Sequence, residues 1–170
     1  CNLIKALNAH LSEDILVESL DVVPADFHAR YSAQKRYYCY QCYTGNNVLF
    51  RNQSWITGQL DQSILQSVAE TVVGEHDFLS FCKFRIDIKS TVCKIYESVW
   101  KKQDKILIYY VSGNRFLHHM VRYLTGTMVE ISRGRFTIES FLNLLNNPEK
   151  NVQIFKAPPQ GLILEKVDYA

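Results

Sequence analysis

The pattern of apolar and polar residues is most regular between Gly113 and Arg135, where it follows the period of an α-helix. A Gly-Asn turn opens this stretch and Gly134 lies near its end, so the residues between them are predicted to be helical. Placed at about 100° per residue, the side chains separate into an apolar arc and a polar side. The apolar arc holds Phe116, Leu117, Met120, Val121, Tyr123, Leu124, Met128 and Ile131, and the polar side holds His118, His119, Arg122, Thr125 and Gly126.

The polar side of this predicted helix differs from one that faces water, which usually carries Lys and Glu. It carries two histidines, an arginine and a glycine, and this favours a helix that lies between a core and a cleft. Gly126 follows Arg122 by one turn and would let another backbone or a ligand come close. The alternative is an ordinary amphipathic helix whose polar side is solvated.

Runs of β-branched and aromatic residues, bounded by turn residues, predict five strands. Two of them are joined by a short polar link and therefore predict a hairpin. In the strand that begins at Lys35, alternation of side chains places Arg36, Tyr38, Tyr40 and Cys42 on one face. The predicted strands cover residues 15–23, 35–43, 90–100, 104–112 and 162–169.

Helical periodicity also predicts shorter helices. Asp61 is the expected N-cap and Gly74 the expected stop of one of them, and Thr137 with Ser140 resembles a capping box at the start of another. Together with the strands, the order of these elements predicts an α+β domain with a largely antiparallel sheet. The helical segments are residues 3–11, 58–73, 75–81 and 137–145, while residues 52–57 are expected to be irregular and 158–161 a rigid turn.

Composition narrows the class of protein only slightly. The 170 residues are enough for one domain with a real core, and a net charge of +2 is nearly neutral. Lysine and arginine nevertheless gather in the second half of the chain, which permits an anionic partner. No apolar run reaches the roughly 18 residues that span a bilayer, so we expect no membrane contact. No signal peptide is recognised, so we expect a cytoplasmic protein.

Several kinds of chemistry lack their usual residue pattern. Cys39 and Cys42 would point to opposite faces of a straight strand, so a metal or redox pair is not expected there. His28, His76 and His118 lack the spacing of metal ligands, and we expect no metal. The chain has neither a Gly-x-Ser-x-Gly elbow nor a glycine-rich phosphate loop.

Three polar clusters are the remaining candidates for a functional site. One is the segment from Asp26 to Arg30, the second is Arg36 with Tyr38, and the third is His118 with Arg122. A tyrosine beside an arginine suits stacking on a nucleic-acid base, and arginine suits contact with phosphate. The residues alone therefore favour nucleic-acid binding.

Five motifs, taken in order along the chain, closely resemble the tRNA pseudouridine synthase A family. The resemblance implies the pseudouridine synthase fold, a mixed and mostly antiparallel sheet flanked by helices. It also implies an isomerase that acts on uridines around positions 38 to 40 of the anticodon stem-loop of tRNA, as a homodimer and without a cofactor. The motifs are Val23-Pro-Ala-Asp-Phe-His-Ala-Arg-Tyr-Ser-Ala33, Arg36-x-Tyr38-x-Tyr40, His76-Asp-Phe-x-Ser-Phe81, Phe116-Leu-x-His-Met-Val-Arg122-x-x-x-Gly126 and Ala157-Pro-Pro-x-Gly-Leu-x-Leu164-x-x-Val-Asp-Tyr169.

The same resemblance implies roles for individual residues. Tyr38 would stack on the target base, and Arg122 would pair with the catalytic aspartate of the family. Leu162 and Leu164 would lie near the base pocket. Contacts with RNA are expected of Arg30, Arg36, His118 and His119. For Tyr38, a packed tyrosine of the sheet is the alternative.

One departure from the family's pattern concerns the catalytic aspartate, which lies in a Gly-Arg-Thr-Asp loop that is absent from these residues. We therefore expect residues 1–170 to be the C-terminal catalytic-domain portion of such an enzyme, inactive alone because the carboxylate is missing. A smaller departure is Lys94, at a position where the family usually has an arginine. Lysine keeps the positive charge but lacks the guanidinium group that binds an anion through two hydrogen bonds. The alternatives are a non-catalytic RNA-binding or dimerisation module, a synthase for another RNA and, more distantly, a zinc or redox protein.

Overall fold

The computed structural model describes residues 3–169, and its internal contacts divide the chain into two units, residues 1–32 and 33–170. The first unit contains one short helix, α1 (Leu3–Asn8). The side chain of Asn8 donates to the Val17 carbonyl at 2.9 Å and accepts from the Val17 amide at 2.8 Å, which folds the following chain back.

The prediction of a strand at residues 15–23 is wrong, because this segment has no regular structure. Val and Ile favour strands when they pack on a pleated sheet, so their preference has little effect without a paired neighbour. No strand pairing within residues 3–169 includes this segment, and Leu16 is 72% exposed.

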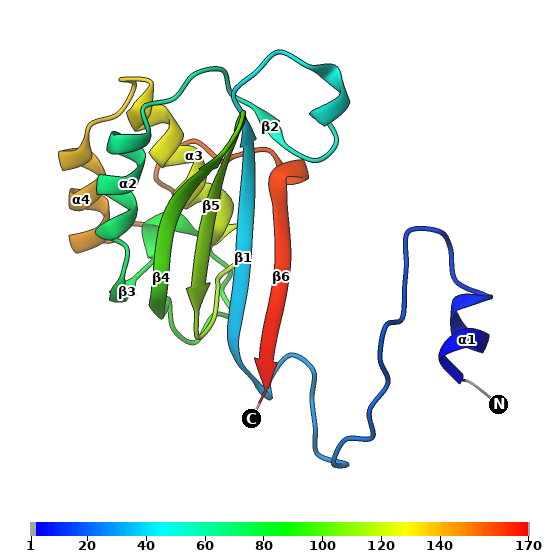
Figure 1. Cartoon of the computed structure of the whole chain (residues 1–170). Helices are drawn as coiled ribbons and strands as arrows, with labels where there is room; N and C mark the ends of the chain where they lie inside the picture. The colour runs from blue at the N-terminus through cyan, green and yellow to red at the C-terminus, as the bar shows by residue number, and fades with distance from the viewer. Residues whose placement is uncertain (1–2, 170) are drawn as a thin grey trace. The chain divides into compact units, whose positions relative to one another are not determined.

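The second unit is built on a six-stranded sheet with the long strand β1 (Ala33–Tyr43) inside it. One edge of β1 pairs with β5 along its length, while β6 and then the two-residue β2 share the other edge (Figure 1). Every pairing is antiparallel except β1 with β2, so the predicted mixed, mostly antiparallel sheet is confirmed. The other strands are β2 (Trp55–Ile56), β3 (Gly74–Asp77), β4 (Val92–Gln103), β5 (Ile106–Gly113) and β6 (Leu162–Tyr169).

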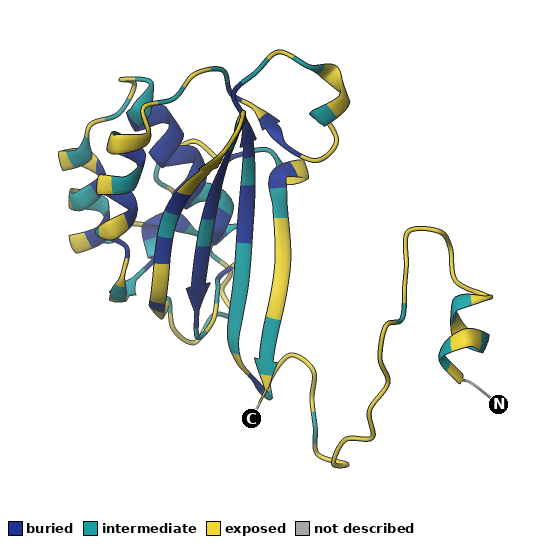
Figure 2. Cartoon of the chain, viewed as in Figure 1, coloured by how far each residue is buried: buried dark blue, intermediate teal, exposed yellow. Residues whose placement is uncertain are grey.

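Helices α2 (Gln62–Glu70), α3 (Met120–Ser132) and α4 (Ile138–Asn146) lie on the same side of this sheet (Figure 1). The core lies between these helices and the sheet, where Figure 2 shows the buried positions. Tyr40 and Cys42 belong to this core, which confirms the face of β1 that alternation predicted. Three short 3-10 turns complete the unit, at Val48–Phe50, Leu79–Phe81 and Pro159–Gly161.

Local capping agrees with the sequence where a side chain reaches a nearby amide. Asp61 accepts from the amides of Ser63 and Ile64 at the start of α2, as predicted. Thr137 and Ser140 form the predicted reciprocal capping box at the start of α4. These interactions need only adjacent residues, so they can be predicted from the sequence.

Several predicted elements have different boundaries or types. Residues 52–57, predicted to be irregular, contain β2, and the helix predicted for residues 58–73 covers only Gln62–Glu70. The hairpin turn is shorter than expected, because β4 continues to Gln103 and the chain reverses at Asp104, whose φ is 53°. Residues 75–81 are not one helical turn, since Gly74–Asp77 forms β3 at the sheet edge and only Leu79–Phe81 is helical. In β3, His76 pairs with Cys93 of β4, so the neighbouring strand overrides the local preference.

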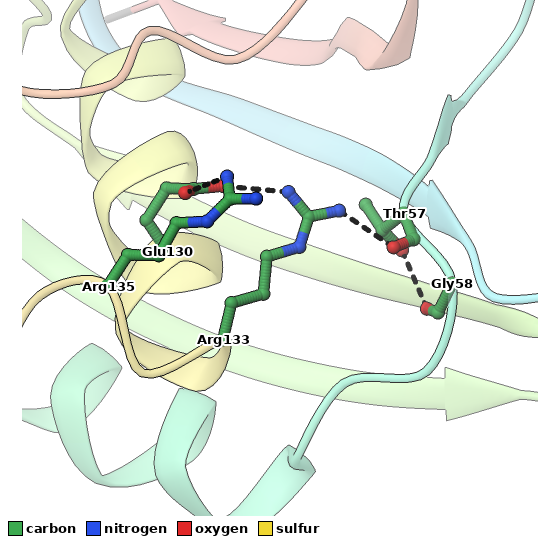
Figure 3. A network of polar contacts seen from close by, with 5 residues as sticks. All are labelled: Thr57, Gly58, Glu130, Arg133 and Arg135. Carbon is green, nitrogen blue, oxygen red and sulfur yellow. Dashed lines mark hydrogen bonds and ion pairs between the residues drawn. The ribbon is translucent and has the colours of Figure 1, made fainter.

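A buried ion network joins the end of α3 to the chain after β2 (Figure 3). Glu130 is 2% exposed and accepts from Arg133 and Arg135, each at 2.7 Å. Arg133 also donates to the carbonyl of Thr57 at 2.7 Å. The two arginines therefore compensate the burial of the carboxylate, and the hydrogen bond from Arg133 to Thr57 fixes these segments together.

In the part of the chain that the structure describes, no helix has both the length and the apolar character needed to cross a membrane.

Candidate active site

Tyr38 lies near the middle of β1, on the side of the sheet that faces the helices. It pairs with Val111 of β5 and Leu164 of β6, and the ring of Phe116 meets its ring edge-on at 5.1 Å. The side chain is half-buried, and this burial raises the pKa of its hydroxyl, with the Arg36 charge acting in the opposite direction. The ring is thus held in place while part of it remains accessible.

The hydroxyl of Tyr38 distinguishes it from the neighbouring tyrosines. The Tyr37 hydroxyl donates to Asp168 at 2.8 Å, and the Tyr40 hydroxyl donates to the Pro158 carbonyl at 2.6 Å. Within residues 3–169, the Tyr38 hydroxyl makes no hydrogen bond, and it is not a fully buried atom. This favours an accessible tyrosine over one that is used only to pack the sheet.

Leu162 and Leu164 form an apolar border beside Tyr38. Leu162 pairs with Tyr40 and packs against the core, while Leu164 pairs with Tyr38 and is 50% exposed. A large apolar side chain with half of its surface open, next to an accessible aromatic ring, suits contact with the flat face of a base.

Arg122 lies on the first turn of α3 and is held by the segment that precedes β6. Its Nε donates to the Ala157 carbonyl at 2.7 Å, and its own carbonyl accepts from the Ala157 amide at 3.0 Å. One terminal nitrogen, Nη1, lies 3.5 Å from Nδ1 of His119. No carboxylate of the described residues forms an ion pair with Arg122.

Gly126 makes this arrangement possible, because a side chain at its position would collide with the backbone of Phe155 and Ala157. The expected close approach at this glycine is therefore confirmed, and the approaching group is another backbone. The prediction that Thr125 and Gly126 lie on a side open to a cleft is therefore wrong. Both residues are buried, and residues 155–157 cover Gly126.

His118 and His119 precede α3, which begins only at Met120. His119 has a φ of 65°, a left-handed conformation outside the helical range, so the helix begins later than the sequence predicted. The two rings stack at 3.8 Å, with His118 exposed and His119 partly buried. Burial, followed by the charges of His118, Lys156, Arg122 and Lys83, lowers the pKa of His119 to about 4, so its ring is neutral at pH 7.

The two remaining arginines of the predicted site differ in their positions. Arg36 donates to the carbonyls of Ala33 and Asn114, at 2.8 and 2.5 Å, and thereby joins β1 to the loop before α3. Arg30 belongs to the unit of residues 1–32, where its amide donates to His28 Nδ1 at 3.1 Å. Its contact with RNA stays a prediction.

A closed series of contacts brings most of the predicted residues together. Tyr38 contacts Phe116, and the same loop continues through the histidines to Arg122. Arg122 is bonded to Ala157, and the adjoining Pro158 accepts from Tyr40, two residues from Tyr38. Sequence analysis missed the contributions of Phe116 and Ala157, because each depends on a contact between segments far apart in the chain.

Four cysteines lie in the described part of the chain. Cys39, Cys42, Cys82 and Cys93 are all free, and no three His, Cys, Asp or Glu residues there gather as metal ligands. Burial raises the pKa of the Cys39 thiol to about 12, with Glu165 adding to the effect, so this thiol is protonated and unreactive at pH 7.

The chain matches known protein sequences along nearly all of its length. A sequence model described as tRNA pseudouridine synthase matches residues 68–170. The chain is 38% identical to tRNA pseudouridine synthase A of Dictyoglomus turgidum over 168 residues, which is 97% of the chain and 68% of the relative. It is 39% identical to the protein of the same name from Chlorobium limicola over 165 residues, or 96% of the chain and 68% of the relative. The chain belongs to the tRNA pseudouridine synthase family.

Proposed function

We propose that the protein isomerises uridine to pseudouridine in the anticodon stem-loop of tRNA, around positions 38 to 40. In this reaction uracil is detached from C1′ of its ribose, turned and rejoined through C5. A base in a stacked stem cannot be reached directly, so it must first be flipped out of the stack. The site therefore needs a surface that holds a flipped base and a group that controls a catalytic carboxylate.

The surface at Tyr38 is the observation that carries this proposal. Its ring is fixed edge-on by Phe116, its hydroxyl has no hydrogen bond within residues 3–169, and its neighbour Leu164 is 50% exposed. An aromatic face beside an open leucine supports stacking of uracil between them. Tyr38 then binds the substrate base, and Leu162 and Leu164 border the base pocket.

Arg122 is the group that we propose controls the catalytic carboxylate. Its Nε is held by Ala157, which fixes the direction of the guanidinium, and no carboxylate of the described residues pairs with it. A planar guanidinium binds a carboxylate through two parallel hydrogen bonds, which supports a role in orienting the catalytic aspartate. The 170 residues contain no Gly-Arg-Thr-Asp sequence, so we propose that alone they bind RNA without isomerising it.

The test uses the complete product of the gene that encodes these residues, with an unmodified tRNA transcript as substrate. Pseudouridine is detected by carbodiimide labelling and primer extension, and is expected at one of positions 38 to 40. Arg122→Ala should lower kcat much more than it changes KM, whereas Lys105→Ala at the β4–β5 turn should change neither. Failure of the complete protein to form pseudouridine contradicts the proposal.

The second candidate is a module that binds RNA or dimerises but does not catalyse. The lack of a carboxylate partner at Arg122 within the described residues favours it. The 170-residue chain, assayed beside the complete protein, separates the two parts of the proposal. Pseudouridine formed by the 170 residues alone would contradict their proposed inactivity.

We also propose that the enzyme is a cytoplasmic homodimer that uses no cofactor. The four cysteines within residues 3–169 are free, which suits a reducing compartment. For the homodimer, the support is the face of the sheet opposite α2, α3 and α4, which none of these three helices covers (Figure 1). Tyr37 and Cys39 of β1 point to that face. So do Tyr110 of β5 and Ile163 of β6, because both pair with Cys39.

A further inference from the structure

Positive side chains from three separate segments gather around His119. Lys83 follows the turn Leu79–Phe81, and its amide donates to the His118 carbonyl at 2.9 Å. Lys156 precedes Ala157, which is bonded through both its amide and its carbonyl to Arg122. These backbone contacts fix Lys83 beside His118, and Lys156 beside the residue that is bonded to Arg122.

The electrostatic surroundings of His119 are positive. The groups whose charges lower its pKa are all basic side chains, namely His118, Lys156, Arg122 and Lys83. Within residues 3–169, neither Lys83 nor Lys156 forms an ion pair with a carboxylate. Lys156 has an aromatic neighbour, Tyr123, with its ammonium 5.9 Å from the ring centre. A concentration of like charges without a counter-charge favours binding of an anion.

The exposure of these groups differs from that of a structural ion network. Lys83, His118 and Lys156 are all exposed, whereas the buried carboxylate Glu130 is already satisfied by two arginines. The cluster is joined to the proposed base site through Arg122 and through the loop that carries Phe116. An anion bound here would therefore lie next to the substrate base.

We propose that Lys83, His118 and Lys156 form a phosphate-binding site for the RNA backbone beside the flipped uridine. Flipping a nucleotide rotates its backbone and moves the adjoining phosphodiesters towards the protein, where exposed lysines bind them as point charges. The site positions the RNA and takes no part in bond making or breaking. This inference rests on the proposed function, because it assigns the anion to the RNA substrate.

The experiment measures binding of a 17-nucleotide anticodon stem-loop hairpin to the complete protein by fluorescence anisotropy at several KCl concentrations. Each neutralised phosphate contributes about 0.7 to 1 to the slope of log K against log salt. Lys83→Ala and Lys156→Ala should each reduce the slope by about that amount, and the double variant by about the sum. Lys105→Ala is the matched control, because Lys105 lies in the turn between β4 and β5 and outside the proposed site. It should leave the slope unchanged.

Pseudouridine formation by the same preparations separates this inference from the proposed function. Wild-type activity with an unchanged slope in the double variant overturns the phosphate site and leaves the enzyme activity standing. A reduced slope without any pseudouridine supports the phosphate site and overturns the proposed reaction. An unchanged far-ultraviolet circular dichroism spectrum and melting temperature show that each variant is folded.

Discussion

At the scale of single residues, Tyr38 and Tyr40 lie on the same face of one strand and have different surroundings. Tyr40 is fully buried and its hydroxyl donates to Pro158, whereas Tyr38 is half-buried and its hydroxyl has no hydrogen bond within residues 3–169. Burial and a satisfied hydroxyl indicate a structural role for Tyr40. Partial exposure leaves the ring of Tyr38 available for a base.

Replacing Tyr38 by Ala is expected to weaken binding of the substrate base, because one stacking surface is lost. Stacking on an aromatic ring contributes about 1–3 kcal/mol per base, so KM should rise about 5- to 150-fold. Tyr38→Phe keeps the ring and should retain most of the binding. Steady-state kinetics of the complete enzyme on tRNA measure both effects.

Tyr40→Phe is the comparison for this pair. It removes a buried hydrogen bond to Pro158 and should lower the free energy of unfolding by about 1 kcal/mol or somewhat more. A Tyr38→Ala variant that loses stability but keeps its KM would contradict the assignment of Tyr38 to the base.

His119 gives the protein a pH dependence whose sign follows from its lowered pKa. Its pKa falls from 6.5 to about 4 on folding, first because of burial and then because of the surrounding cations. Between these values the unfolded chain binds more protons at this residue than the folded chain, so acid favours unfolding. The free energy of unfolding should therefore fall as pH is lowered from 6.5 towards 4.

Urea unfolding of wild type and His119→Asn at pH 7.5, 6 and 5 tests this contribution. Asparagine tolerates the left-handed φ of 65° at this position and does not titrate. Wild type should lose more stability than the variant between pH 7.5 and 5. Parallel pH profiles would show that His119 does not contribute.

At the scale of elements, the packing of α3 against the segment before β6 determines the direction of Arg122. The contact is close because Gly126 has no side chain where the backbone of residues 155–157 crosses the helix. The same segment accepts hydrogen bonds from both Arg122 and Tyr40. The contact between α3 and residues 155–157 therefore contributes both to the stability of the fold and to the geometry of the site.

Gly126→Ala is expected to destabilise the protein and to reduce kcat. The added methyl group must displace backbone, and overpacking of this kind costs about 1–3 kcal/mol. The displaced segment carries the acceptor for Arg122, so catalysis should fall even where the variant remains folded. Thermal unfolding and steady-state kinetics on tRNA give the two measurements.

Gly134→Asn is the control for this glycine. Gly134 has a φ of 72° with open space where the first atom of a side chain would lie, and asparagine tolerates that conformation. It should change stability and kcat little. Equal losses in both variants would mean that the helix, rather than the crossing at Gly126, is sensitive to substitution.

At the scale of the whole molecule, the sheet has one face covered by three helices and another that these helices leave open. Ile163 of β6 lies on the open face, since it pairs with Cys39, and it is 38% exposed. Leu164, the next residue, points to the side that carries Tyr38. Substitutions at these two adjacent residues therefore test the two faces of the sheet separately.

Ile163→Glu is expected to dissociate the proposed homodimer, because it places a charge in an apolar contact. Light scattering during size-exclusion chromatography should give twice the mass of one chain for wild type and a single chain's mass for the variant. Leu164→Glu should remain dimeric and lose binding of the hairpin RNA. A wild-type protein that elutes as a monomer at micromolar concentration contradicts the dimer.

The sequence by itself determined what depends on neighbouring residues. It predicted the α+β class, the strands around Tyr38 and Leu162, the cap at Asp61 and the capping box at Thr137, because side-chain alternation and capping act over a few residues. Through motifs with fixed spacing it also indicated the family. It wrongly predicted a strand at 15–23 and one helical turn at 75–81, since pairing with another strand decides such segments.

Only the tertiary structure decided which polar groups lie together. Arg122 is held by Ala157, Tyr38 is fixed by Phe116, and Lys83 and Lys156 lie near the histidines. Each of these contacts depends on segments distant in sequence. The physical reason is that hydrogen bonds and charges act over a few ångströms of space, whatever the separation along the chain. Local pattern therefore identified the reactive residue types, and packing of α3 against the sheet and residues 155–157 assembled them into a site.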